Sequence, residues 1–93
     1  MIYVVAYDIS SDRRRVKVAD ALRSRGYRIQ ESVFQVRLTA EDLDQVRSQL
    51  RALIDDIEDV VHIYPVCASC AGNAEVLGAA VALDDVGLCR GVW

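Results

Sequence analysis

The sequence predicts an α+β fold with two helices on one face of an antiparallel sheet. Apolar segments with strand-like and helix-like spacing alternate along the chain in the order β-α-β-β-α-β. The links between them are short, and no linker, internal repeat or low-complexity segment divides the 93 residues. This order is typical of a split βαβ, ferredoxin-like sheet. We therefore expect one ferredoxin-like domain over residues 1–93, with an added C-terminal strand.

The first predicted strand is the apolar run 2–7, which is rich in Val and Tyr. Ser10 or Ser11 can cap the helix that follows, and Asp12 lies in its first turn, where a negative charge suits the helix dipole. We expect this helix to stop at Gly26, because glycine is favoured just after helix ends. Its apolar stripe consists of Val18, Ala19, Ala21 and Leu22.

Residues 27–38 are predicted to be extended, because their apolar side chains alternate. By this alternation one face holds Tyr27, Ile29 and Val33, and the other holds Phe34, Val36 and Leu38. The swap of face within one run indicates a bulge or a tight reversal near Glu31–Ser32. One bent strand and two short strands both remain open.

A second helix is predicted over roughly residues 40–55. Thr39 precedes it, and Asp42 follows three residues later, which is a capping signature. Apolar residues recur at helical spacing through this segment and just beyond it, at Leu43, Val46, Leu50, Leu53, Ile54 and Ile57.

The last third of the chain is predicted to hold two strands, a loop and an apolar extension. We expect a strand over 59–66, a loop over 67–73 and a short strand over 75–78. The extension covers about 79–93 and ends on Trp93. An antiparallel sheet with both helices on one face leaves its other face bare. We therefore expect a homodimer in which a second copy covers that face.

The composition excludes disordered and membrane-spanning proteins. With 53% apolar and 27% charged residues, the chain is typical of a globular domain. No apolar run approaches the roughly 20 residues that cross a bilayer. The short apolar stretch at the N-terminus has no basic leader before it, unlike a signal peptide. We expect a cytoplasmic protein with no membrane partner.

Charge is unevenly distributed along the chain. Residues 1–37 carry eight basic and four acidic side chains, a net charge of +4, whereas residues 38–93 carry three basic and ten acidic side chains, a net charge of −7. Because contacts with phosphate need a basic patch, this asymmetry indicates one face for an anionic partner, although the formal net charge is −3.

Asp8 ends the first predicted strand and is the first candidate for chemistry. One interpretation is a turn acid that caps the exit from the strand. The other is a metal ligand, because Mg²⁺ accepts one or two carboxylates and fills its other positions with water. In a symmetric dimer one aspartate becomes two, and a hard metal ion on that pair could activate water against a phosphodiester bond.

Three consecutive arginines, Arg13, Arg14 and Arg15, lie at the start of the first predicted helix. One interpretation is a solvated helix face. Each cation near a helix N-terminus, however, costs roughly a few tenths of a kcal/mol, and such local conflicts often mark function. Because arginine makes forked contacts with phosphate, the alternative is a clamp on a nucleic-acid backbone. Other cations that could extend this clamp are Lys17, Arg23, Arg25 and Arg28.

Cys67 and Cys70 form a single CxxC motif after the strand predicted over 59–66. One CxxC is half of a zinc site, and in a cytosolic protein it can also be a redox pair. A third interpretation is a pair of small residues in a loop. The sequence leaves these three open.

Four segments together resemble a known family. "VVAYDIS" places Tyr-Asp-Ile after an apolar strand, and "RIQESVF" follows the first helix. With "VVHIYPV" and "EVLG", they resemble the small CRISPR-associated endoribonuclease family, whose members are the lesser subunit of the spacer-acquisition integrase. The resemblance runs from Ile2 to about Gly78.

The resemblance implies a ferredoxin-like homodimer in which the final strand of each chain, here within about 79–93, pairs with the partner protomer. It implies that Asp8 of both copies holds a divalent metal ion, usually Mg²⁺. The candidate catalytic residues on this basis are Asp8, Tyr7, Arg28 and Phe34. The candidate residues for nucleic-acid binding are Arg13, Arg14, Arg15, Lys17 and Arg28.

Two functions are compatible with this resemblance. The first is a metal-dependent endonuclease that cuts single-stranded RNA or double-stranded DNA during spacer acquisition for antiviral defence. The alternative is a dimeric scaffold that bridges dimers of the large integrase subunit and holds DNA by its phosphates without cutting it. The arginines suit both functions, because backbone contact is common to both. Only Asp8 distinguishes the endonuclease from the scaffold.

Overall fold

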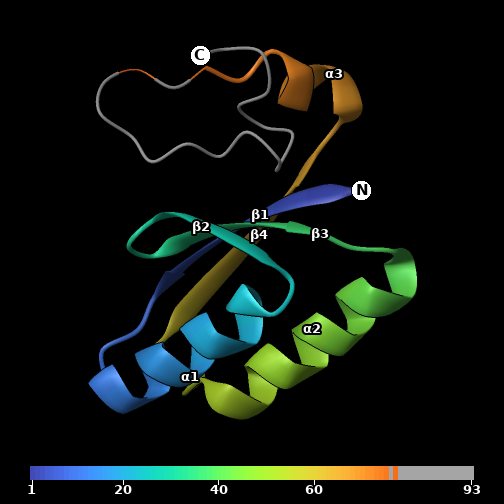
Figure 1. The fold of residues 1–93 in the computed structure, drawn as a ribbon. Coiled ribbons are helices and arrows are strands. Elements are labelled where there is room, and N and C mark those ends of the chain that lie inside the picture. The colour runs from blue at the N-terminus through green and yellow to red at the C-terminus, as the bar shows by residue number, and fades with distance from the viewer. Residues whose placement is uncertain (76, 78–93) are drawn as a thin grey trace.

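The computed structural model describes residues 1–75 and residue 77. The elements follow the order β-α-β-β-α-β and end in a short third helix (Figure 1). Their bounds are β1 Ile2–Asp8, α1 Asp12–Arg23, β2 Gly26–Gln30, β3 Val33–Arg37, α2 Ala40–Leu53, β4 Val60–Val66 and α3 Ala68–Gly72. No described helix has the length and apolar character that a membrane span requires.

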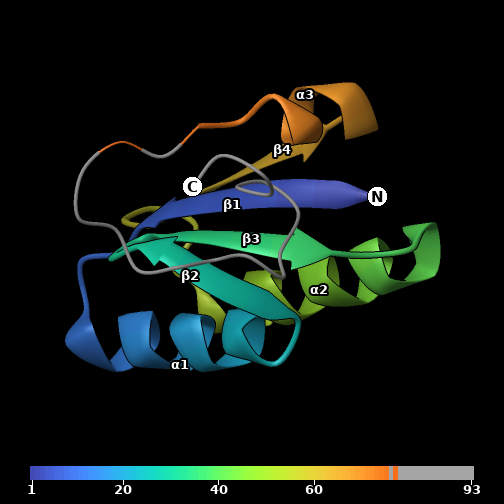
Figure 2. The same ribbon diagram turned by 45° about the horizontal axis from the view of Figure 1, so that its top comes forward.

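The four strands form one antiparallel sheet in the order β2-β3-β1-β4. β1 lies in the interior of the sheet, between β3 and β4. Helices α1 and α2 cover one face of this sheet, while α3 follows the end of β4 on the other side (Figures 1 and 2). This is the split βαβ arrangement, so the predicted α+β, ferredoxin-like fold class with two helices on one face is confirmed.

The core lies between the sheet and the two long helices. Alternate residues of β1 face the helices, and Val5 is fully buried there. The other fully buried large side chains come from α1 and β3 and are Val18, Leu22, Phe34 and Val36. Burying an apolar side chain of this size contributes roughly 1.5–3 kcal/mol, so this layer is the main source of stability.

Both predicted helix caps are present. The Ser11 hydroxyl oxygen accepts a hydrogen bond from the Arg14 backbone N–H at 3.3 Å, which selects Ser11 over Ser10 as the cap of α1. The Thr39 hydroxyl accepts from the backbone N–H of Asp42 at 3.1 Å at the start of α2. Each cap satisfies a backbone donor that has no partner inside its helix.

The stretch 27–38 contains two strands rather than one bent strand. β2 and β3 form a hairpin around Glu31 and Ser32, and their register shifts between Arg28 and Gln30. The predicted reversal near Glu31–Ser32 is therefore confirmed, and a bulge accompanies it.

Gly26 has a different role from the predicted one. α1 ends at Arg23, where the backbone N–H of Arg25 bonds to the carbonyl of Leu22 at 2.9 Å, and Gly26 opens β2. A Cβ atom at this position would collide with the backbone carbonyl oxygen of Gln35 on β3. The glycine is needed because two strand backbones approach closely here, so its assignment as a helix stop was wrong.

Two further differences concern the second half of the chain, and one prediction there is untested. Ile57 lies beyond the end of α2 and is 94% exposed, so it does not belong to the apolar face of that helix. The segment 67–73, predicted to be a loop, contains α3. The strand predicted over 75–78, except for Glu75 and Leu77, and the extension over about 79–93 lie outside the described residues.

The face of the sheet away from α1 and α2 also carries large apolar side chains. The register places Tyr27, Gln35, Val4 and Tyr64 in one row across the four strands. Tyr27 and Tyr64, at the two ends of this row, are 46% and 51% exposed. This is the face that we expect a second copy to cover, and the homodimer stays a prediction.

Candidate metal and nucleic-acid site

Asp8 is the last residue of β1 and pairs in register with Val60, the first residue of β4. Because side chains alternate along a strand, it lies on the opposite face from Tyr7, which is buried under the helices. The carboxylate is exposed and makes no hydrogen bond or ion pair within the described part of the chain. Both of its oxygens are therefore available to a cation.

Tyr7, Phe34 and Arg28 come together on the helix side of the same end of the sheet. The Tyr7 and Phe34 rings are stacked with centroids 6.3 Å apart, and the Arg28 guanidinium carbon lies 5.3 Å from the centroid of the Phe34 ring. The Tyr7 hydroxyl donates to the backbone carbonyl of Glu31 at 3.3 Å. Phe34 is fully buried and Tyr7 nearly so, whereas Arg28 is exposed. Of the three, Arg28 is the one placed to touch a ligand directly.

Arg13 and Lys17 are the exposed cations of the first two turns of α1. They lie four residues apart, so they share one side of the helix. Neither forms an ion pair or a side-chain hydrogen bond with another described residue. Their charges are available to a polyanion that approaches this side of α1.

Arg15 is partly engaged within the chain. Its guanidinium donates to the Asp12 carboxylate at 2.7 Å and to the backbone carbonyl of Ile9 at 3.2 and 3.3 Å. These contacts hold the guanidinium beside the link between β1 and α1. The side chain is 39% exposed, so it stays partly open to solvent.

Arg14 is bound to an aspartate that the sequence analysis did not single out. Its Nε donates to Asp59 Oδ2 at 2.7 Å and its Nη2 donates to Asp59 Oδ1 at 3.3 Å, while Glu58 lies 3.6 Å from Nη2. The Asp59 side chain has no exposed surface. It also accepts from the backbone N–H groups of Ser10 at 3.2 Å and Asp55 at 2.8 Å.

These contacts set the charge states of the pair. The hydrogen bond from Arg14, helped by the backbone N–H groups of Asp55 and Ser10, outweighs burial and lowers the pKa of Asp59 to about 2. The same hydrogen bond raises the pKa of Arg14. Both groups stay charged at neutral pH. The only sequence signal for Asp59 is an acid at the first position of the strand predicted over 59–66, which is too common to indicate a buried ion pair.

The chemistry of Asp8 fits a hard divalent cation. No group of three or more His, Cys, Asp or Glu residues gathers as a metal site within the described residues. Asp8 alone supplies one carboxylate, and Mg²⁺ is commonly held by one or two carboxylates with water completing its octahedral shell. An exposed carboxylate without a competing partner suits that mode of binding.

One family model matches this chain. The model of the CRISPR-associated protein Cas2 matches residues 1–74, which include every described strand and helix. The chain belongs to the Cas2 family. The resemblance drawn from its sequence is thereby confirmed.

Two curated Cas2 relatives match most of the chain. It is 44% identical over 79 residues to a protein of Chloroflexus aurantiacus named CRISPR-associated endoribonuclease Cas2 1, covering 84% of this chain and 85% of the relative. It is 48% identical over 77 residues to a protein of Thermus thermophilus named CRISPR-associated endonuclease Cas2 2, covering 83% and 81%.

Solved structures agree with the Cas2 assignment. A crystal structure of a hypothetical protein from Thermus thermophilus, 44% identical, superposes with a TM-score of 0.78 and covers 87% of this chain and 94% of its own. The crystal structure of Streptococcus pyogenes Cas2 at pH 6.5, 26% identical, gives a TM-score of 0.77 over 84% of this chain and 100% of its own.

Proposed function

We propose that this chain is a magnesium-dependent endonuclease that hydrolyses phosphodiester bonds of single-stranded RNA or double-stranded DNA during CRISPR spacer acquisition. Its support is the Cas2 family and the names endoribonuclease and endonuclease carried by relatives that are 44% and 48% identical. The observation that carries the proposal is Asp8, an exposed carboxylate without a partner among the described residues, at the end of the central strand β1.

In this proposal the working unit is a homodimer. The apolar sheet face around Tyr27 and Tyr64 lies against the second copy, which brings the two Asp8 carboxylates together. These carboxylates hold Mg²⁺, which when bound supplies positive charge at the phosphate and favours ionisation of water. The Tyr7–Phe34 stack holds the end of β1 in place, so these two residues orient Asp8 without touching the nucleic acid.

The cations of the chain bind the nucleic-acid backbone in the proposal. Arg13 and Lys17 make the main phosphate contacts, and the partly exposed Arg15 and the exposed Arg28 add to them. Arg14 is left out, because it is paired with the buried carboxylate of Asp59, whereas Arg15 is paired with the exposed carboxylate of Asp12. Contacts of this type do not depend on base identity, so we expect little sequence preference.

The test is Asp8→Asn in the purified full-length chain with Mg²⁺. We expect cleavage of single-stranded RNA or duplex DNA to fall by about 100-fold or more, because the substitution removes a metal ligand at each half of the site. Nucleic-acid binding should stay unchanged. Asp56→Asn is the matched control, since Asp56 is exposed and carries no described side-chain contact. Cleavage that survives Asp8→Asn contradicts the proposed role of Asp8.

The scaffold is the second candidate function, and the pair Arg13 and Lys17 favours it, because phosphate binding needs no carboxylate. As a scaffold, the dimer would bridge dimers of the large integrase subunit and hold DNA. The wild-type chain would then bind DNA and the large subunit without cutting under Mg²⁺ at any pH. In that case Asp8→Asn would leave spacer acquisition intact.

A further inference from the structure

Cys67 and Cys70 lie close together where β4 ends and α3 begins. Cys67 is the N-cap residue of α3, and its sulfur accepts a hydrogen bond from the Cys70 backbone N–H at 3.4 Å. The Ser69 hydroxyl lies 3.4 Å from the same sulfur. Both cysteines are exposed and both are free thiols. The pair is therefore open to solvent reagents and lies within one turn of chain.

The backbone of this turn suits a disulfide. The N–H of Ala71 bonds to the carbonyl of Cys67 at 2.9 Å, which closes a helical turn containing both cysteines. Three residues along a helical turn bring Cα atoms to roughly 5–6 Å. Disulfide-bonded cysteines have Cα atoms about 4.4–6.8 Å apart, so the two sulfurs can join without moving the strand.

The two thiols differ in their environment. Hydrogen bonds from the Ser69 hydroxyl, the Cys70 thiol and the Cys70 backbone N–H lower the pKa of Cys67 to about 7. The pKa of Cys70 is raised, chiefly by its hydrogen bond to Cys67. Near neutral pH, Cys67 therefore carries the larger share of thiolate while Cys70 stays protonated, which is the division of roles that thiol–disulfide exchange uses.

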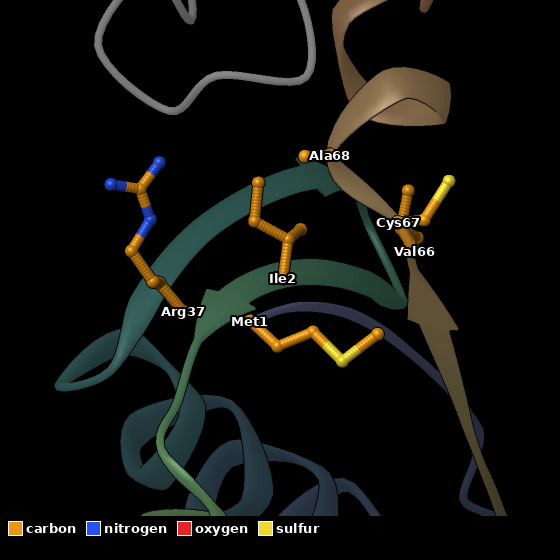
Figure 3. Close-up of a pocket in the computed structure, with 6 residues that line it drawn as sticks. All are labelled: Met1, Ile2, Arg37, Val66, Cys67 and Ala68. Carbon is orange, nitrogen blue, oxygen red and sulfur yellow. The ribbon is translucent and has the colours of Figure 1, made fainter.

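Figure 3 shows Cys67 at the edge of a pocket of about 420 Å³ that also includes Ile2 and Arg37. Its sulfur points away from both of these residues. A disulfide in solution can therefore reach it without entering the pocket. Asp8 lies at the far end of β1, where it pairs with the first residue of β4, whereas Cys67 follows the last residue of β4. The cysteine pair is thus separate from the Asp8 site.

We propose that Cys67 and Cys70 form a thiol–disulfide exchange site that accepts low-molecular-weight disulfides. The Cys67 thiolate attacks one sulfur of the disulfide RSSR, forming a mixed disulfide and releasing one thiolate RS⁻. The Cys70 thiol then loses its proton and attacks the Cys67 sulfur, releasing the second RS⁻. Overall, two protein thiols and RSSR give the Cys67–Cys70 disulfide and two RSH, so the chain loses two electrons and two protons to RSSR.

A disulfide is favoured over a metal site within one chain. Zinc in structural sites takes four ligands, commonly thiolates and imidazoles. In the described part of the chain, no third His, Cys, Asp or Glu residue joins the two cysteines. Two thiols in one turn are enough to form a disulfide, but they supply only two of the four ligands of a structural zinc site.

The experiment treats the reduced full-length chain with oxidised glutathione at pH 7 and follows its mass. Cys89→Ser is the background, so that only Cys67 and Cys70 can react. We expect the chain to lose the mass of two hydrogens and to retain no glutathione. With Cys70→Ser, one glutathione should stay attached at Cys67. With Cys67→Ser, the reaction should slow by about tenfold or more, because the remaining thiol is protonated.

Ser69→Ala is the matched control for the assigned roles. Removing its hydroxyl should move the pH midpoint of Cys67 alkylation upward while the fold stays intact, since Ser69 is exposed. Equal rates for Cys67→Ser and Cys70→Ser would overturn the assignment of the nucleophile. A background chain that retains two glutathiones, or that binds Zn²⁺ between two copies and resists exchange, would overturn the site itself.

Discussion

Asp8 and Asp59 lie at the same end of the sheet but in opposite environments. Asp8 pairs with Val60, and Asp59 directly precedes Val60. Asp59 has no exposed side-chain surface and accepts four hydrogen bonds from Ser10, Arg14 and Asp55. Asp8 is exposed and accepts none within the described residues. The neighbours of a carboxylate, rather than its place in the topology, decide whether it serves stability or is free for chemistry.

Arg13 and Arg14 repeat this contrast one residue apart. Arg14 reaches back to Asp59, whereas Arg13 extends into solvent without a described partner. The three consecutive arginines therefore have at least two different roles.

The largest effect on stability is expected for Asp59→Ala. The substitution removes the partner of Arg14 and leaves the N–H groups of Ser10 and Asp55 unsatisfied. We expect the melting temperature to fall by roughly 10 °C or more. Asp8→Ala should leave the melting temperature unchanged. Thermal unfolding followed by circular dichroism measures both melting temperatures. An equal fall for Asp59→Ala and Asp8→Ala would contradict the contrast between the two aspartates.

Arg14→Ala should lower the melting temperature less than Asp59→Ala does. Arg14 is partly exposed, and without it Asp59 keeps its two backbone donors. Arg13→Ala should have no effect on the melting temperature. A double-mutant cycle of Arg14→Ala with Asp59→Ala measures the coupling between the two residues. Strictly additive losses of stability in the double mutant would show that Arg14 and Asp59 are not energetically coupled.

Stability should depend on pH through Asp59. Its pKa is about 2 in the folded chain, below the ordinary value of about 3.9 for an unfolded aspartate. A group with a depressed pKa adds stability that is fully present above the unfolded value. That stability is lost as pH falls toward the folded value. Urea unfolding between pH 5 and 2 should show this loss in the wild type, and Asp59→Asn should flatten that part of the curve.

The smallest effect is expected for single exposed cations. Arg13→Ala and Lys17→Ala should each weaken duplex binding several-fold, with the slope of log affinity against log salt reduced by about 1 per cation. Arg14→Ala should leave that slope nearly unchanged, because its guanidinium is already occupied. Fluorescence anisotropy over a salt series gives these slopes. A slope change for Arg14→Ala equal to that for Arg13→Ala would place Arg14 among the phosphate contacts.

The local signals in the sequence predicted the fold well. A continuous apolar run identified β1, and alternation identified the segment that holds β2 and β3. The cap signals at Ser10 or Ser11 and at Thr39 marked the starts of both long helices. Gly26 was misassigned because glycine serves equally after a helix and at a close strand contact, and only the position of Gln35 decides between them. Helix α3 was missed because five residues carry no periodic pattern.

The candidate site was only partly predictable. The end of a strand is exposed in most sheets, so the position of Asp8 could be predicted from the sequence. The burial of Asp59 could not, because it depends on contacts between segments more than 40 residues apart. For the same reason, nothing local distinguishes Arg14 from Arg13, and the complete burial of Phe34 appears only once the helices pack over β3.

The hydrogen bonds at Asp59 join the link after β1, the first turn of α1 and the link after α2 through a single side chain. When the Asp59 side chain loses these hydrogen bonds, the three segments lose their shared contact at the same time. The backbone hydrogens of Ser10 and Asp55 should therefore exchange with deuterium at matched rates, as one cooperative opening. The edge of the domain beside Asp8 should therefore open as a unit.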